Sequence, residues 1–373
     1  MAPRSAEAMH AKPVLFVTGH APAYRLGAFA RLHELENVEF ALFGGRSKHG
    51  GELPEGDLPF PHRRVSEREL GALAGAGAHR AVVCSTAGRL APLGSWAGAR
   101  RAHVPLILWG SLWAHPQTIA HAFSYLPLRR LYRSADAIVT YGPHVSAYVG
   151  ARGARNVHVA PQSVDNEFWS SPQARAPAGE WWPREASVRV LFVGRPAREK
   201  GLEVLLEAWR ERTRIAPGGA LVLAGVGARP PGWIAASAAA EGVLCTDALA
   251  PEALRDVYEG CEMLVLPSLA TRTFREPWGL VINEAMNRGL PVVASDAVGA
   301  AAGGLVRERQ NGLVVPAGDA GALGAAIREL AGDARMRERL GAAGALDVRA
   351  YSHEAWAEGF SGALASVGAS SRA

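Results

Sequence analysis

The stretch REPWGLVINEAMNRGLPVVAS, residues 275–295, predicts a loop, a short helix and a strand in that order. Pro277 biases the preceding residue toward an extended conformation, so a helix can begin only between Pro277 and Gly279. Gly289 is expected to end this helix, and the apolar run LPVVAS after it is typical of a buried strand. A helix followed closely by a buried strand is the repeating element of a parallel α/β sheet.

Two carboxylates border this otherwise apolar segment. Glu276 and Glu284 are eight positions apart, and on one continuous helix eight residues turn through about 800°, which would leave them about 80° apart. Pro277 and Gly279 exclude a continuous helix, so we interpret Glu276 as a loop residue and Glu284 as a residue two turns further on. Charged groups at both ends of a buried segment indicate a binding site.

Strand-like and helix-like runs alternate on both sides of this stretch. The strand-like runs are PVLFVT, VEFALF, RAVVCS, VPLILW, DAIVTYG and VHVAP in the first half, and VRVLFVG, ALVLAG, GVLC, CEMLVLPS, PVVAS and GLVVPAG in the second. Strands that are apolar on both faces predict parallel sheets covered by helices on both sides. We therefore predict an α/β fold of two Rossmann-like, doubly wound domains facing a cleft, residues 1–166 and 188–351, joined by a Pro/Ser/Ala-rich linker over 167–187 and followed by an amphipathic helix within 352–373.

The composition is that of a globular protein. The 373 residues are 49% hydrophobic and 20% charged, and no apolar run reaches the ~18 residues of a membrane-spanning helix. The first residues lack a secretory apolar region, so we expect a cytoplasmic protein. Cys84, Cys245 and Cys261 have no metal-ligand spacing and are expected to be buried, reduced thiols.

Positive charge is concentrated in the first half of the chain. Residues 1–165 contain 18 Lys and Arg against 11 Asp and Glu, which is +7, and the rest contains 22 against 24, which is −2. This asymmetry favours an anionic partner, including peripheral association with the inner face of a membrane, although an arginine-rich composition alone would also produce it. We interpret the basic run PLRRLYRS, residues 127–134, as a solvated helix face rather than a lipid contact. The modest charge and the lack of a basic-aromatic stripe argue against a nucleic-acid partner.

The residues that follow the strands of the second half carry the chemistry. In parallel sheets, ligands bind beyond the carboxyl ends of the strands. GRPAREKG follows VRVLFV, where Gly194 permits a tight turn and Arg195 and Lys200 place two cations beside a helix start. Such a loop suits a diphosphate, while its alternative is a solvated charged loop. Lys200 is one of only three lysines.

The next two strand ends add a glycine turn, with Gly225 at the end of ALVLAG, and the two carboxylates. Carboxylates accept paired hydrogen bonds from the adjacent hydroxyls of sugars, so Glu276 is expected to hold hexose hydroxyls and Glu284 the ribose pair. Backbone amides of the turn that opens the helix would face the diphosphate, namely those of Trp278, Gly279, Leu280 and Val281.

GRPAREKG, followed about eighty residues later by EPWGLVINEAMNRGLPVVAS, resembles the donor site of retaining GT-B glycosyltransferases, in particular glycosyltransferase family 4 with its E-x7-E signature. The segments VTYGPHVSAYVGARGARNVHVAPQSVDNEFW and ERQNGLVVPAGD and the final helix are also similar to that family. The resemblance implies a hexosyltransferase that acts on a nucleotide-diphosphate sugar with retention at the anomeric carbon. It also implies that Arg195 and Lys200 take the place of a divalent metal, so that no cofactor is needed, and that the final helix crosses back to the first domain.

The first half departs from the family in places. Gly19-His20 stands where many relatives have Gly-Gly, and is followed by Tyr24 and Arg25, which could contact the acceptor or cap the next helix. Gln162-Ser163 replaces the usual Asn-Gly. In the loop after VPLILW, the resemblance implies that His115 contacts the donor sugar and the acceptor, with a surface or packing residue as the alternative.

The second half departs at Thr246-Asp247, where the family has a glycine and an aromatic residue, so the sequence does not predict the base. The acceptor is expected to be a hydroxyl of a glycan, glycolipid or natural product, with bacterial cell-surface polysaccharide synthesis as one setting. Two alternatives remain open: a nucleotide-sugar epimerase or hydrolase on the same fold, and a non-catalytic sugar-nucleotide-binding scaffold.

Overall fold

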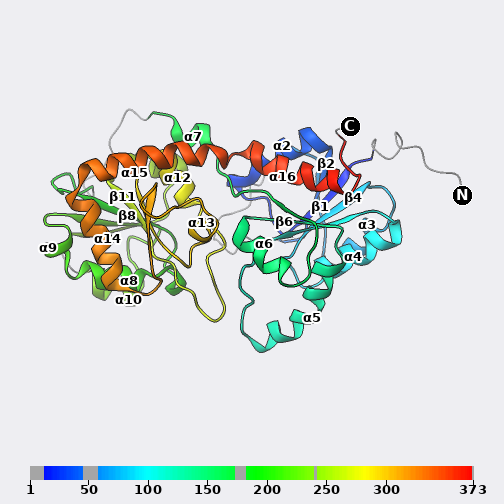
Figure 1. The fold of residues 1–373 in the computed structure, drawn as a ribbon, viewed down its shortest axis with the longest axis horizontal. Coiled ribbons are helices and arrows are strands. Elements are labelled where there is room, and N and C mark those ends of the chain that lie inside the picture. Colours follow the sequence, from blue (N-terminus) through cyan, green and yellow to red (C-terminus); the bar gives the residue numbers. More distant parts are fainter. Residues whose placement is uncertain (1–11, 45–57, 173–181, 239–241, 372–373) are drawn as a thin grey trace, which may run out of the picture. The chain divides into compact units, whose positions relative to one another are not determined.

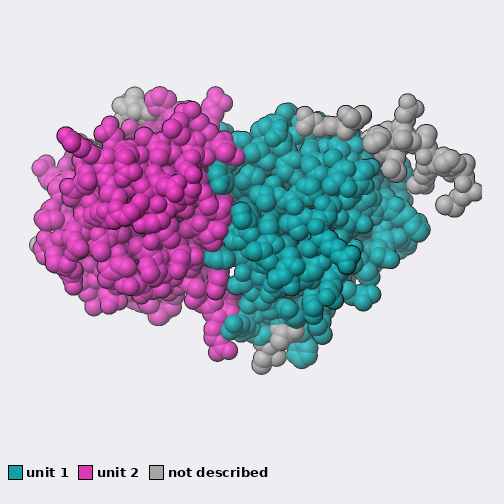
Figure 2. Space-filling view, in the orientation of Figure 1, with its two compact units in different colours: residues 1–165, 351–373 teal, residues 166–350 magenta. Residues whose placement is uncertain are grey.

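The computed structural model describes residues 12–44, 58–172, 182–238 and 242–371. The chain divides into two compact units, which Figure 2 shows in different colours. Unit 1 contains residues 1–165 and 351–373, and unit 2 contains residues 166–350. The final residues therefore belong to the same unit as the first ones.

Unit 1 is built on a parallel sheet in the order β3-β2-β1-β4-β5-β6-β7. Each apolar run predicted as a strand forms one, and the short polar edge strand β3 was missed because HRR carries no apolar signal. The strands are β1 Val14–Thr18, β2 Val38–Leu42, β3 His62–Arg64, β4 Ala81–Ser85, β5 Leu106–Gly110, β6 Ala137–Thr140 and β7 Val157–Val159. The helices are α2 Leu26–Glu36, α3 Leu70–Ala74, α4 Ala91–Ala102, α5 Ile119–Ser134, α6 Pro143–Gly150 and α16 His353–Ser366, with a 3₁₀ turn η1 at Ala23–Arg25 (Figure 1).

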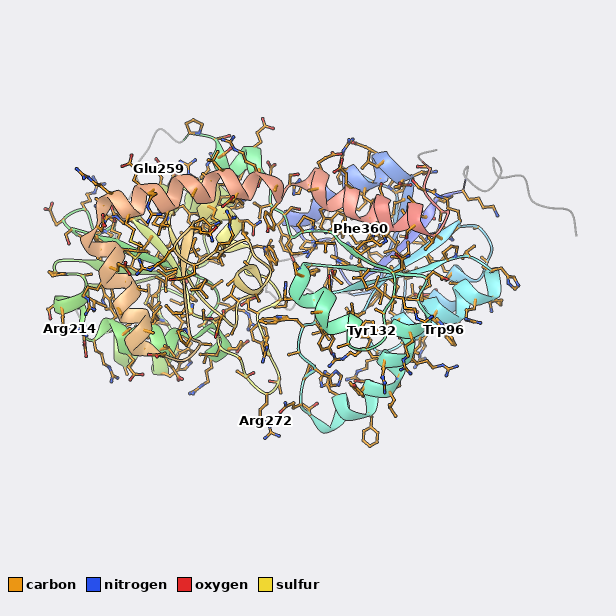
Figure 3. The ribbon with its side chains drawn as sticks, in the orientation of Figure 1. Trp96, Tyr132, Arg214, Glu259, Arg272 and Phe360 are labelled. Carbon is orange, nitrogen blue, oxygen red and sulfur yellow. The ribbon has the colours of Figure 1, made fainter. Side chains whose placement is uncertain are left out.

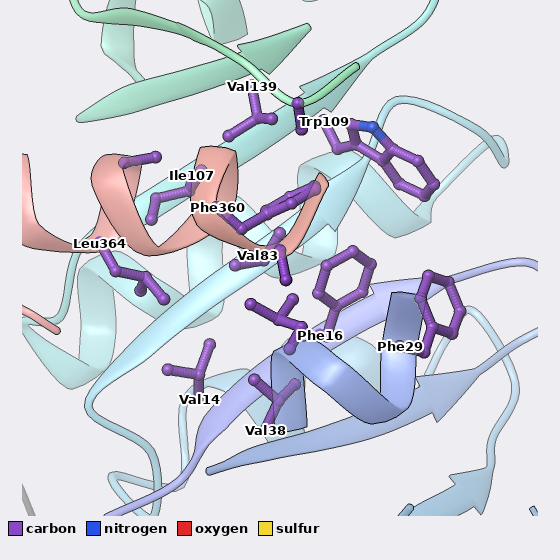
Figure 4. Packing of buried hydrophobic residues seen from close by; sticks show 14 of the residues in the cluster. Val14, Phe16, Phe29, Val38, Val83, Ile107, Trp109, Val139, Phe360 and Leu364 are labelled. Atoms are coloured by element: carbon purple, nitrogen blue, oxygen red, sulfur yellow. The ribbon is translucent and has the colours of Figure 1, made fainter. Parts of the chain in front are cut away.

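Successive strand residues of unit 1 enter two different cores, as the period of two in a strand requires. On one face, Phe16 packs with the helices α2 and α16, while its neighbours Leu15 and Val17 pack with α3, α4, α5 and α6 on the other. Figure 4 shows Phe360 and Leu364 of α16 lying over strand residues of the first face. Ser352 caps α16 by accepting a hydrogen bond from the amide of Ala355.

Unit 2 is built on a parallel sheet in the order β10-β9-β8-β11-β12-β13. Its strands are β8 Arg189–Val193, β9 Ala220–Ala224, β10 Val243–Thr246, β11 Met263–Leu266, β12 Val292–Ser295 and β13 Gly312–Val315. Its helices are α7 Asn166–Ser170, α8 Leu202–Trp209, α9 Arg212–Ile215, α10 Gly232–Ala238, α11 Pro251–Glu259, α12 Val281–Asn287, α13 Gly299–Ala302, α14 Ala320–Gly332 and α15 Ala334–Asp347, with 3₁₀ turns η2 at Arg198–Lys200 and η3 at Val348–Ala350 (Figure 1). The strand order reverses between β8 and β11, and this switch point is where ligands bind in doubly wound sheets.

The predicted linker, residues 167–187, differs from the structure at its start. Residues 166–170 form α7, which is part of unit 2. Arg288 holds this helix by donating hydrogen bonds to the carbonyl oxygens of Trp169 and Ser171, and Asn287 donates one to Asn166. The apolar FW pair of NEFWSS was the signal for this helix. Residues 173–181 of the predicted linker lie outside the described residues.

The helix of the opening stretch begins later than predicted, at Val281. Glu276 is bridged to Val298, and its carbonyl accepts a hydrogen bond from the amide of Gly299 at 3.0 Å. This bridge holds Glu276 outside the helix, and Gly279 then turns the chain with φ +94°. At the other end the prediction is confirmed, because Arg288 closes the helix and Gly289 follows with φ +69°.

Cys84 and Cys261 are buried free thiols as expected, whereas Cys245 is only partly buried. Burial raises the pKa of the Cys84 thiol to about 12, so this thiol is protonated and unreactive at neutral pH. In the described parts of the chain, no helix is both long enough and apolar enough to cross a membrane.

Candidate functional site

The loops after β8 and β11 meet at the switch point of unit 2. Lys200 ends the turn η2, and its Nζ donates a hydrogen bond to Oε2 of Glu276 at 2.5 Å. Both side chains are largely buried, with 17% of Lys200 and 9% of Glu276 exposed. The structure thus brings together two of the predicted site residues that are 76 positions apart in the sequence.

Glu276 is fixed by a second contact. The buried hydroxyl of Ser268, directly after β11, donates a hydrogen bond to the same Oε2 at 3.1 Å. The hydroxyl of Ser295, at the end of β12, donates to the carbonyl oxygen of Ser268. These two serines were missed as site residues, although their positions at the ends of CEMLVLPS and PVVAS were the available signal.

The position of Lys200 depends on a glycine. Gly201 has φ +73°, and a Cβ atom there would lie 1.9 Å from the carbonyl oxygen of Pro267. The backbone of η2 also passes close to the chain after β11, since the amide of Leu269 donates to the carbonyl oxygen of Glu199 at 2.8 Å. No side chain larger than hydrogen fits this crossing, so the contact between the two loops is built into the backbone.

Arg195 and Lys200 make different contacts, although both were predicted to bind the same diphosphate. Arg195 donates to Oε1 of Glu199 at 2.8 Å, and its side chain is 45% exposed. Lys200 instead contacts Glu276. The β8 loop therefore contains one largely buried cation, Lys200, and two exposed ones, Arg195 and Arg198, each paired with a glutamate.

Glu284 contacts a different partner. Tyr258 of α11 donates its hydroxyl hydrogen to Oε2 of Glu284 at 2.7 Å. Burial raises the pKa of the Glu284 carboxyl to about 7, and the hydrogen bond from Tyr258 acts in the opposite direction. Glu276 and Glu284 are thus two carboxylates in different settings, one facing a cation and the other facing a neutral hydroxyl. Tyr258 was not among the predicted site residues.

The glycines at the other strand ends hold the loops close together. Gly225 has φ +88°, and a Cβ there would lie 3.1 Å from the carbonyl oxygen of Gly194. The amides of Gly225 and Gly227 both donate to the carbonyl oxygen of Thr246, at 3.2 and 2.9 Å, and the amide of Ala228 donates to Asp247. Thr246-Asp247, which departs from the family pattern, therefore joins the β9 and β10 loops.

The turn before α12 has a structural side chain at its start. Trp278 is buried, and its indole nitrogen donates to Oδ1 of Asn283 at 2.8 Å. Its carbonyl oxygen accepts a hydrogen bond from the amide of Ala300 at 2.9 Å. Trp278 thus braces the turn that carries Gly279, Leu280 and Val281, whose predicted contact with a diphosphate concerns their backbone amides.

In unit 1, two of the departures from the family meet. Arg25 follows β1, and its Nη2 donates to Oε1 of Gln162 at 2.5 Å and to the hydroxyl of Tyr141 at 3.2 Å. Its guanidinium lies 4.7 Å from the ring of Trp109, and only 8% of the residue is exposed. Within the described residues, no carboxylate forms an ion pair with Arg25. Tyr24, by contrast, is an exposed side chain.

His115 lies among aromatic side chains of unit 1. Its Nε2 is 2.8 Å from the carbonyl oxygen of His121, and its Nδ1 is 3.4 Å from the hydroxyl of Tyr148. The ring of Tyr125 packs edge-on against it. These contacts fit the packing alternative for His115, and its contact with a donor sugar stays a prediction.

Most of unit 2 matches a known family model. Residues 187–333 match the family model described as "Glycosyl transferases group 1". The chain is 32% identical over 183 residues to an alpha-D-kanosaminyltransferase of Streptomyces kanamyceticus, which covers 48% of the chain and 46% of that protein. It is 30% identical over 226 residues to a D-inositol 3-phosphate glycosyltransferase of Segniliparus rotundus, which covers 58% of the chain and 48% of that protein. The chain thus spans about half the length of the curated relatives it matches.

Solved structures extend the likeness to the fold of almost the whole chain. The HepE protein of Anabaena in complex with UDP and glucose superposes with a TM-score of 0.74 at 16% identity, covering 95% of this chain and all of that one. A sucrose-phosphate synthase of Thermosynechococcus elongatus superposes with a TM-score of 0.69 at 20% identity, covering 93% of this chain and 96% of that one. The two Rossmann-like units therefore form a GT-B fold, as predicted.

Proposed function

We propose that this chain is a retaining, metal-independent glycosyltransferase that moves a hexose-type sugar from a nucleotide-diphosphate donor to a hydroxyl group. The observation that carries the proposal is the contact between Lys200 and Glu276 at the switch point of unit 2, within the segment that matches the glycosyl transferase model. At that place the cation can bind the diphosphate of a nucleotide sugar, and the carboxylate can bind the hydroxyls of its sugar.

The reaction needs stabilisation of the leaving group. As the bond from the anomeric carbon to the diphosphate lengthens, negative charge grows on the phosphate oxygens. Lys200 has three N–H donors, of which Glu276 takes one, so the others can bind the phosphate oxygens. Because the ammonium is held by the carboxylate and by the fixed backbone at Gly201, it does not need to reorganise during the reaction. Arg195 adds a second cation, which is more exposed and therefore stabilises the leaving charge less.

Glu276 and Glu284 take different parts of the donor in this proposal. Glu276 is fixed on one oxygen by Lys200 and Ser268, and its carboxylate can accept hydrogen bonds from hexose hydroxyls. Glu284 would accept those of the ribose. Since its carboxyl pKa is about 7, hydroxyl donors that favour the charged form should lower this pKa, so nucleotide affinity should increase as the pH rises through 7.

The relatives support the class of donor and leave the acceptor broad. The name of one relative specifies transfer of kanosamine and that of another specifies transfer to an inositol phosphate, while a structural neighbour was solved with UDP and glucose. We assign this chain a glycan, glycolipid or small natural product as acceptor, with unit 1 as the acceptor-binding domain.

A thermal-shift panel tests the donor claim directly. The intact protein is heated with UDP, GDP, ADP, CMP and dTDP sugars, each with and without a chelator. We expect one nucleotide series to raise the melting temperature equally in both conditions. Loss of the shift with chelator would contradict the metal-independent site, and no shift with any donor would contradict the proposal.

The same donor then separates the alternatives. With a glycan or aglycone acceptor, NMR of the product should show the anomeric configuration of the donor. Full-rate release of free sugar without acceptor would instead select a hydrolase. Binding of the donor with no turnover under any condition would select the non-catalytic scaffold.

A further inference from the structure

A groove between α4 and α5 of unit 1 combines apolar and basic side chains in a matched order. On α4, Leu93, Trp96 and Arg100 are spaced i, i+3 and i+7. On α5, Phe123 and Leu126 with Arg130 repeat this spacing. Positions three and seven residues apart lie within about 60° of each other around a helix, so each triplet forms one stripe. This groove is unrelated to the site in unit 2.

The apolar end of the groove is exposed. A hollow of about 380 Å³ is lined there by Leu93, Trp96, Leu126 and Pro127. Phe123 is 80% exposed and Leu126 is 68% exposed, which is unusual for side chains of this size on neighbouring turns of one helix. Trp96 is labelled on α4 in Figure 3.

The other end of the groove is basic. A hollow of about 440 Å³ shares Trp96, Leu126 and Arg130 with the first one. It is also lined by Arg100, Arg129 and Arg133. Arg100 lies over the ring of Trp96 at 5.5 Å, and neither Arg100 nor Arg130 forms an ion pair within the described residues.

No acidic side chain of α4, of α5 or of the segment between them offsets this charge. Residues 70–135, which contain both helices, have seven arginines and not one Asp or Glu. A solvated helix face normally mixes both signs, as the pairs of Arg31 with Glu34 and Arg214 with Glu211 do elsewhere in the chain. A stretch of this length with seven arginines and no acidic residue points to an anionic partner.

We propose that the groove between α4 and α5 is a docking surface for the anionic surface of a lipid membrane. The arginines would contact lipid phosphates, while Phe123, Leu126 and Leu93 would enter the boundary between headgroups and acyl chains. A soluble anion gives the exposed apolar residues no role, and a second copy of this face would set arginines against arginines. The interpretation of PLRRLYRS as a solvated helix face is thereby replaced. Attachment through this groove is peripheral.

Vesicle flotation of the intact protein tests the proposal without reference to catalysis. The probes are vesicles of phosphatidylcholine alone and of phosphatidylcholine mixed with phosphatidylglycerol. We expect binding to the mixed vesicles only, and weaker binding as salt screens the arginines. Equal binding to both vesicle types, or to neither, would overturn the proposal.

Matched variants locate the surface. R100A/R130A should weaken binding about 30-fold, because each arginine contributes a factor of about five at an anionic surface. F123S/L126S should weaken it at least about tenfold while the remaining binding keeps its salt dependence. The controls R328A/R335A and L346S remove comparable exposed groups from unit 2 and should change nothing. Equal losses in the controls, or none in the groove variants, would overturn the assignment.

Two other occupants of the groove, a free anion and a second copy of this chain, predict different results. Stabilisation by inorganic phosphate that R100A/R130A abolishes, without vesicle binding, would assign the groove to a free anion. A dimer in analytical ultracentrifugation that F123S/L126S dissociates, without vesicle binding, would assign it to a second copy. Either result contradicts a membrane surface.

Discussion

The two units each hold a largely buried cation after the first strand of their sheet, but they balance its charge differently. In unit 2, Lys200 faces the carboxylate of Glu276. In unit 1, Arg25 is held by the neutral oxygens of Gln162 and Tyr141 and by the ring of Trp109. Unit 2 therefore contains a charge-balanced pair whose cation has further N–H donors, whereas the cation of unit 1 is held by neutral polar and aromatic groups.

This difference predicts different roles for the two cations. An ammonium with three donors and 17% of its surface exposed can bind a phosphate without leaving Glu276. The guanidinium of Arg25 bridges residues that follow β1, β6 and β7, so it joins the ends of three strands. We expect changes in unit 2 to affect catalysis first and changes at Arg25 to affect stability first.

The largest expected effect on stability concerns the glycine that positions Lys200. G201A should lower the free energy of unfolding by at least about 3 kcal/mol, since the left-handed backbone costs about 1–2 kcal/mol and the contact with Pro267 adds a clash. The control G289A has a similar φ of +69° with open space around it, so about 1–2 kcal/mol is expected. Urea unfolding measures both. Equal losses would show that the loop crossing is not tight.

An intermediate effect tests the comparison itself. Q162L should cost about 2 kcal/mol of stability, because it leaves a buried guanidinium without its best acceptor. E276Q should cost less, since Lys200 can turn toward water, yet it should lower turnover strongly. Thermal unfolding and initial rates are measured on both proteins. A greater stability loss in E276Q than in Q162L would reverse the roles that we assign to the two cations.

The sequence predicted features that depend on local patterns, and it did not predict the individual contacts between residues far apart in the chain. The apolar runs predicted the main strands, and the spacing in GRPAREKG and EPWGLVINEA indicated the residues that meet at the switch point, because strand ends of a parallel sheet collect at one edge. Contacts set by packing had no such signal. Tyr258 reaches Glu284 from another helix.

The same reasoning explains two details that the sequence alone did not settle. The bridge between Glu276 and Val298 delays the start of α12, and a partner 22 positions away cannot be predicted from local pattern. The meeting of Arg25 with Gln162 is likewise visible only in the fold.

The smallest expected effect is pH-dependent. The Glu284 carboxyl has a pKa raised to about 7, so its contribution to stability is complete below its unfolded pKa and is lost as the pH rises to 7 and above. For a fully buried group this shift from 4.5 to about 7 would be worth about 3 kcal/mol. Because Glu284 is only partly buried, water screens part of it, and we expect the native protein to lose on the order of 1–2 kcal/mol relative to E284Q between about pH 4.5 and 8. Urea unfolding of both proteins across this range measures it. A constant difference would show that Glu284 does not titrate in this window.

The central claim is that Lys200 stabilises the charge of a departing diphosphate, and turnover of K200A tests it most directly. Its matched control is R198A, which removes an exposed cation from the same turn that pairs with Glu203. We predict that K200A lowers kcat at least about a hundredfold, as expected for loss of one preorganised donor, while R198A stays within about twofold of the native rate. Equal rates for K200A and R198A would contradict the account.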